Sequence, residues 1–345
     1  MSQQFAISYT SIFRILIVLL SLLFVYFIRD IIVILFLSII LAAAFDPMVS
    51  WFERRQLPRS FGVLTIYVLL FTVISVIGIL LMPVISAQGN FLANNLPLLF
   101  RRLVDQVGGS GMGGVFSQSD QLIQDVSQTF GTVFKGVFPA LRGVFGGTVT
   151  LLLTLVLTFY LSVEDRGLKR FFRSILPDQY QPYFTRMMNR VQKKMGMWFR
   201  GQMLLSLVIF IVTAVSLLIT HLITGAIPYW LLLALIAGIL ESVPFIGPLI
   251  AGAISVLLVS SNSLTIAAIV LGISIIIQQL ENHILVPKIM QKTVGLNPIV
   301  VILVVIIGYR LSGVIGALIA IPVAAAVQVF LKDVMRKEET APIPQ

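Results

Sequence analysis

Long runs of apolar residues separated by short polar loops constrain this chain more than any other feature. The first run, Ile12 to Ile28, is followed at once by a second that ends near residue 48. Hydrophobic residues make up 58% of the 345 residues and charged residues only 11%, whereas about a quarter of a soluble domain is charged. Because about 20 apolar residues carry a helix across a bilayer, we predict an all-α, polytopic integral membrane protein.

Basic residues gather in two of the loops between the predicted spans. Residues 53–59 hold one acidic and three basic side chains, and residues 164–200 hold three acidic and nine basic ones. Cytoplasmic loops of membrane proteins are rich in lysine and arginine, so we place both loops, and with them both termini, on the cytoplasmic side. The net charge of +10 then indicates contact with the lipid bilayer and not with nucleic acid.

These patterns divide the chain into six segments. In chain order they are residues 1–83, three transmembrane helices of a scaffold; 84–146, an extracytoplasmic amphipathic segment; 147–163, a fourth transmembrane helix; 164–200, a basic cytoplasmic amphipathic segment expected to form an interfacial helix pair; 201–331, a transport region; and 332–345, a cytoplasmic tail.

The transport region contains an internal repeat. The sequence IGPLIA at Ile246–Ala251 recurs 69 residues later as IGALIA at Ile315–Ala320. Each copy interrupts an apolar run with glycine or proline, and paired interruptions at corresponding places indicate the binding site of a transporter. Chance likeness in a chain rich in isoleucine, leucine, alanine and glycine is the alternative. Two further echoes stand upstream at an offset of 70: Gly225–Pro228 with Gly295–Pro298, and Gly238 with Gly308.

The positive-inside rule favours one membrane topology for the first copy of the repeat. If residues 230–258 simply crossed the membrane, Lys288 and Lys292 would lie outside. If residues 229–259 instead enter from outside, turn near Pro244–Pro248 and leave on the same side, both lysines are cytoplasmic. We therefore predict a re-entrant hairpin followed by a span.

The second copy, residues 298–331, is expected to enter from the cytoplasm and turn near Gly308–Gly316. Each repeat is then one transmembrane helix plus one re-entrant hairpin, and the two copies have opposite orientation, as in an inverted repeat. Unwound backbone at membrane depth is tolerated only inside protein or beside an aqueous cavity. Two such tips predict a cavity between them.

Two ionisable residues stand at the predicted tips. Glu241 precedes the first turn and Arg310 lies at the second, at equivalent positions of the repeat and with opposite charge. Ionisable groups deep in a membrane are costly and are functional candidates. If the two tips meet, the two side chains could pair across the pseudo-twofold axis, in a substrate or proton site whose pairing changes between states. A static salt bridge and a charge in a water-filled vestibule are the alternatives.

A polar cluster and several helix breaks complete the candidate solute or ion pathway. Gln278, Glu281 and Asn282 share one face of a helix at i, i+3, i+4 spacing. They suit a polar solute path, or they are merely interfacial. The breaks expose backbone carbonyls and amides that could bind a cation or an oxygen-rich solute, or they allow close helix packing; they are Pro244, Gly247, Pro248 and Gly313.

Other chemistry finds little support. The chain has no cysteine and two histidines, so we expect no transition-metal site. It contains no P-loop, no Gly-x-Ser-x-Gly and no zincin motif. We therefore predict no catalytic residues, no cofactor and no enzymatic activity.

Three motifs in the carboxy-terminal half resemble the autoinducer-2 exporter family of bacterial permeases. They are Val243–Pro248, Gln279–Met290 and Gly313–Pro322, and the likeness extends to Gly201-Gln202 and Phe159–Leu161. The resemblance covers most of the chain and implies an oligomeric inner-membrane transporter. Some relatives are credited with export of autoinducer-2, a small hydroxylated furanone derivative, and others with sodium- or lithium-for-proton antiport. Glu241 and Glu281 fall at polar positions of the matched motifs, whereas Arg310 and His283 are not carried over.

The sequence thus leads to three functional hypotheses. The first is a permease that exports a small polar organic solute, such as one like autoinducer-2, by alternating access of the hairpins against the scaffold. The second is a sodium(lithium)/proton antiporter in which Glu241 and Glu281 titrate. The third is a non-transporting envelope scaffold protein that binds partners through residues 84–146. In the first two, residues 1–163 are expected to form the contact of a homo-oligomer.

Overall fold

A computed structural model describes most of the predicted spans, and its described residues form helices with no strand. The described residues are 9–73, 75–76, 79, 148–164, 170, 174–244, 246–260, 263–290 and 296–339. The all-α prediction is confirmed in these ranges. The predicted extracytoplasmic segment 84–146 lies outside them, as does the end of the cytoplasmic tail.

Within the described ranges, three helices are long and apolar enough to cross a membrane: Arg29–Glu53, Asp178–Thr224 and Leu264–Met290. The first is α2, and the second contains α8, Gln181–Thr224. The third joins α11 (Leu264–Leu280), a π-helical turn (Glu281–Leu285) and α12 (Val286–Met290). The described scaffold also contains α1 (Tyr9–Phe27) before α2, and the helix Arg59–Val73 and α6 (Thr148–Val163) after it.

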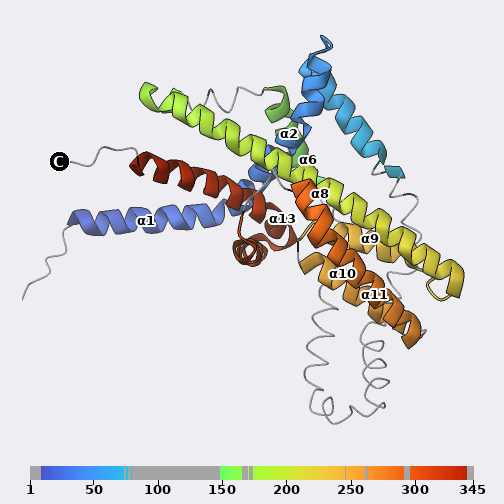
Figure 1. Cartoon of the computed structure of the whole chain (residues 1–345). Coiled ribbons are helices and arrows are strands. Elements are labelled where there is room, and N and C mark those ends of the chain that lie inside the picture. Colours follow the sequence, from blue (N-terminus) through green and yellow to red (C-terminus); the bar gives the residue numbers. More distant parts are fainter. Residues whose placement is uncertain are drawn as a thin grey trace, which may run out of the picture.

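The long helix α8 organises the molecule. Its 44 residues correspond to a length of about 66 Å at about 1.5 Å per residue. Figure 1 shows α8 running across the whole structure, with α9, α10 and α11 grouped along its carboxy-terminal half and α2 and α13 packed nearer its middle. The helix ends where Gly225 adopts a left-handed conformation (φ 67°) and donates its N–H to the carbonyl of His221.

Helix α8 continues through the boundary that the sequence placed between residues 200 and 201. The basic residues 181–200 are therefore a direct extension of the span and not a separate helix. Two glycines at this boundary, Gly196 and Gly201, do not break the helix. Each of them allows another segment to pack closely against α8. A Cβ at Gly196 would collide with the carbonyl of Ala43 in α2, and one at Gly201 would come within 3.0 Å of the Met290 sulfur.

The first predicted hairpin is present as two short helices, α9 (Trp230–Leu240) and α10 (Ile246–Ser260). They have 11 and 15 residues, fewer than the ~20 that cross a bilayer. Gly247 lies so close to the carbonyl of Leu240 that no side chain would fit there. Apolar side chains of α8, α9, α10 and α11 form the main core between them; the most deeply buried include Leu205, Leu232, Leu233, Ile254 and Leu258.

The second predicted hairpin lies within α13, Pro298–Glu339. This helix is broken at Ser312 and at Gly313, whose φ of 60° and ψ of −144° are accessible almost only to glycine. The break folds the chain back, so that the backbones of Gly308 and Gly316 are in direct contact. Both hairpins thus exist as folded units, and their re-entry into the bilayer stays a prediction.

The scaffold helices are joined by hydrogen bonds from side chains to the backbone of α6. Ser38 of α2 donates to the carbonyl of Thr154 (3.1 Å). Tyr67, in the apolar helix Arg59–Val73, donates to the carbonyl of Leu155 (2.6 Å). In contrast, α1 packs only lightly on α2 and projects away from the body (Figure 1). Most of its described large apolar side chains are exposed.

Candidate functional site

Glu241 is the most unusual residue of the described structure. It follows the last residue of α9, at the start of the first hairpin turn, and its side chain is 0% exposed. Neither carboxylate oxygen has a hydrogen-bond partner among the described residues. Its main-chain carbonyl, by contrast, accepts a short hydrogen bond of 2.6 Å from the Gln202 side chain of α8.

Glu281 is 5% exposed. Its carboxyl group is near enough to that of Glu241 for the two charges to interact, although 40 residues separate them in the chain. Glu281 opens the π-helical turn, and such turns often occur at functional sites. One of its oxygens accepts a weak hydrogen bond of 3.4 Å from the side chain of Gln278.

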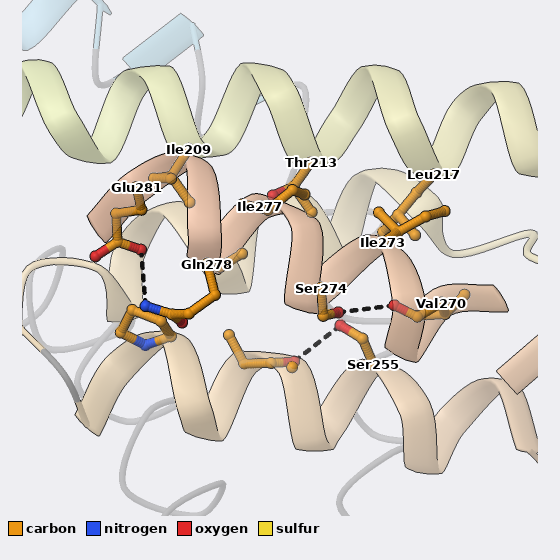
Figure 2. Close-up of a pocket in the computed structure, with 14 residues that line it drawn as sticks. Ile209, Thr213, Leu217, Ser255, Val270, Ile273, Ser274, Ile277, Gln278 and Glu281 are labelled. Atoms are coloured by element: carbon orange, nitrogen blue, oxygen red, sulfur yellow. Dashed lines mark hydrogen bonds between the residues drawn. The ribbon is translucent and has the colours of Figure 1, made fainter. Parts of the chain in front are cut away.

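A small cavity adjoins Glu281 between α8, α10 and α11 (Figure 2). Its volume is about 40 Å³, which holds a few water molecules at about 10–15 Å³ each. Helix residues with apolar side chains form most of its wall. The polar residues in the lining are one of α8, one of α10, two of α11 and the first residue of the π-helical turn: Thr213, Ser255, Ser274, Gln278 and Glu281.

Three of the predicted helix breaks lie at or near this cavity. Pro248 lines it, and Gly247 is buried in the contact between α10 and the end of α9. Pro244 lies half-buried in the turn that joins these two helices. The first hairpin therefore forms one wall of the cavity. The same hairpin carries Glu241, which is not among the residues that line the cavity.

Two of the predicted pathway residues point away from the cavity. Asn282 is exposed, because the π-helical turn alters the spacing on which its predicted common face with Gln278 and Glu281 depended. Arg310 is also exposed. In its half of α13, the helix face that packs toward the core is the one that carries Val305.

The pairing of Arg310 with Glu241 is not seen: no ion pair joins them within the described ranges, and the carboxylate oxygens of Glu241 accept no hydrogen bond there. Gly313 lies at the break of α13, as expected, but does not line the cavity. The second tip therefore supplies no seen partner for the carboxylate pair among the described residues, although Val243 and Ile246 of the first hairpin pack against the apolar cluster that includes Ala317.

The sequence analysis missed several polar residues of this site. Ser255 and Ser274 each donate their hydroxyl to the carbonyl four residues earlier, at 2.8 and 2.9 Å. This local bond lets a hydroxyl sit in any apolar helix, so single serines and threonines carry little signal. Gln202 offered more signal, because an amide inside an apolar helix needs a partner.

The donor set is made of oxygen and amide groups. Among the described residues, no three His, Cys, Asp or Glu side chains gather in one place. Carboxylate, hydroxyl and carbonyl oxygens are the ligands of hard cations rather than of soft transition metals. A transition metal therefore does not fit this cavity, whereas a proton, a monovalent cation or water does.

Comparison with known proteins assigns the chain to a family. A family model described as AI-2E family transporter matches residues 15–336. This chain belongs to the AI-2E transporter family. It is therefore a membrane permease of a transporter family, and the resemblance noted in the sequence is confirmed.

Individual relatives align over most of their length. The "Putative transport protein YrrI" of Bacillus subtilis is 26% identical over 90% of this chain and 88% of its own length. "Putative transport protein YueF" of the same organism is 26% identical over 91% and 86%. A Synechocystis protein, "Putative transport protein sll0063", is 23% identical over 94% and 83%. None of these names specifies a substrate.

Proposed function

We propose that this AI-2E family member moves protons or monovalent cations across the membrane, with Glu241 and Glu281 as the binding groups. One observation carries the proposal: the fully buried Glu241 carboxylate accepts no hydrogen bond from the described residues and lies next to a second buried carboxylate. A buried charge without a partner costs several kcal/mol. Each carboxyl group therefore needs a proton or a cation, and exchange of one for the other is the elementary step of antiport.

The cavity supports this cargo over a larger one. At about 40 Å³ it is far smaller than the roughly 300–1,000 Å³ of a typical organic ligand site. A proton or a dehydrated monovalent cation is small enough for the cavity that Glu281, Ser255 and Ser274 line. We infer that the hairpins open the site alternately to each side by moving against the scaffold.

The test is ion flux in sealed vesicles. Purified protein in proteoliposomes is exposed to a sodium or lithium gradient, and internal pH is followed with a trapped dye. We expect cation-dependent proton movement that is lost in Glu241→Gln and in Glu281→Gln but kept in Glu164→Gln, which changes an exposed carboxylate. Equal flux in all four proteins would exclude a role for the buried pair.

Export of a small polar organic solute is the second candidate. The hydroxyl and amide groups of Thr213, Ser255 and Gln278 favour it, because they are the groups that would hydrogen-bond a hydroxylated solute such as autoinducer-2. Such a solute requires α10 and α11 to separate from α8 in another state. Efflux of labelled polyols from preloaded vesicles tests it, and a Gly252→Ala variant, whose Cβ would lie 3.6 Å from Ser274, should slow solute efflux more than cation flux.

We propose further that the protein lies in a bacterial inner membrane with both termini in the cytoplasm and assembles as a homo-oligomer. The exposed apolar side chains of α1 support contact with lipid or with another copy. Because the chain has no cysteine, Ser261→Cys and Lys288→Cys can be labelled selectively in intact and opened cells. The two should react from opposite sides; reaction from the same side would overturn the re-entrant topology.

A further inference from the structure

Gln202 joins α8 to the tip of the first hairpin. Its side chain is 2% exposed, and its Nε2 donates to the main-chain carbonyl of Glu241 at 2.6 Å. That carbonyl belongs to the end of α9, where the last carbonyls of a helix have no intrahelical partner. At membrane depth water cannot replace the missing donor. The Gln202 amide therefore holds the hairpin tip at one position along α8.

The preceding residue contacts the other carboxylate-bearing segment. A Cβ at Gly201 would lie 3.0 Å from the Met290 sulfur and 3.6 Å from Ile289. Both belong to α12, which continues directly from the π-helical turn opened by Glu281. The absence of a side chain at Gly201 thus sets how closely this segment approaches α8.

Two adjacent residues of one rigid helix consequently determine the positions of two carboxylates that are far apart in the chain. We propose that Gly201-Gln202 is the positioning element of the carboxylate pair: Gln202 fixes Glu241 through its backbone, and Gly201 fixes the approach of the segment that carries Glu281. Neither residue touches the cargo. The inference rests on the proposed function, because it assigns how that site is held together.

The variant Gln202→Met tests the first half. It keeps an unbranched, helix-compatible side chain of similar length and removes the donor. A lost hydrogen bond of this kind corresponds to about tenfold in an equilibrium constant. We expect the apparent affinity for sodium or lithium, measured as the salt-dependent rise in melting temperature of the detergent-solubilised protein, to fall about tenfold. Gln192→Leu, which alters a half-buried glutamine of the same helix, should change it less than twofold.

A double-mutant cycle separates positioning from a general loss of stability. Glu241→Asp keeps a carboxylate but withdraws it from its position, so Gln202→Met should weaken cation binding less in that background than in the natural protein. Additive effects would overturn the inference, because they would mean that Gln202 acts independently of Glu241. A lower melting temperature without added cation, with unchanged cation affinity, would also overturn it.

The second half is tested by Gly201→Ala. We expect reduced cation affinity that is restored by Met290→Leu, which shortens the side chain that the new Cβ meets. Failure of this rescue would contradict the role of Gly201. Absence of any cation effect on the natural protein would instead remove the proposed function, whereas a normal cation effect that Gln202→Met leaves intact would remove only this inference.

Discussion

The described molecule contains two buried polar regions, and they differ in how their polar atoms are satisfied. In the scaffold, side chains of Ser38, Tyr67 and Arg59 each donate to a main-chain carbonyl of α6. At the hairpin site, both oxygens of Glu241 are buried without a donor among the described residues. The first region holds helices together, whereas the second is suited to exchange a proton or cation for another.

The comparison teaches which part of the protein can move. Hydrogen bonds from side chain to backbone between membrane helices resist separation, so α2, α6 and the helix Arg59–Val73 are expected to stay together during transport. The hairpin α9–α10 is tied to α8 by apolar packing and by the Gln202 hydrogen bond. Apart from this hydrogen bond, the described part of the hairpin is held by apolar contacts, which are non-directional and can slide.

The largest contrast is expected for Glu241→Gln. Transport should fall by about 100-fold or more, as for the loss of a group that carries a proton, while the melting temperature should not decrease, because a neutral amide replaces an unpartnered buried carboxylate. Vesicle flux and thermal unfolding measured on the same preparation check this. A large loss of stability would show that Glu241 is structural, like the scaffold residues.

A smaller effect is expected at the break of α13. Gly313→Ala places a side chain at φ 60°, ψ −144° and should cost about 1–3 kcal/mol. Gly225→Ala is the matched control, because φ 67°, ψ 0° lies in the left-handed region that other residues occupy at a cost of about 1–2 kcal/mol. Thermal unfolding should rank the two variants in this order, and the reverse order would exclude strain at the second hairpin.

In the scaffold, Arg59→Ala should reduce stability and spare transport. Arg59 contacts Glu53 (2.9 Å), Asp46 (3.0 Å) and the carbonyl of Ser162 (3.1 Å). Because both carboxylates are half exposed, with relative side-chain accessibilities of 54%, we expect a loss of about 1–2 kcal/mol. Transport per folded molecule should stay within twofold of the natural protein. A loss of transport without a loss of stability would mean that the scaffold also takes part in transport.

The smallest effect is expected for Tyr67→Phe. It removes the hydrogen bond to the carbonyl of Leu155 (2.6 Å) and keeps the ring that packs near Phe45 and Phe159. We expect a loss of about 1 kcal/mol and no change in the sodium or lithium dependence of flux. A changed cation dependence would mean that the scaffold takes part in binding.

Much of the site could be predicted from residue type and spacing. Carboxylates are rare in apolar helices, so Glu241 and Glu281 were visible as candidates without any structure. Proline and glycine leave a local signature, and Pro244, Gly247 and Gly313 all fall at turns or close backbone contacts. The π-helical turn at Glu281 has no such signature, which is why Asn282 was assigned to the wrong face.

Residue type and spacing alone determined that this chain is a bundle of apolar helices with two broken segments and two carboxylates in costly places, because hydrophobic run length, glycine and proline act locally. Only the tertiary structure decided which residues contact one another. Three features depend on which helix faces pack together: the burial of Glu241 near Glu281, the exposure of Arg310 and the hydrogen bond from Gln202 to the hairpin tip. That packing is set by side-chain shape over the whole core, which no local pattern encodes.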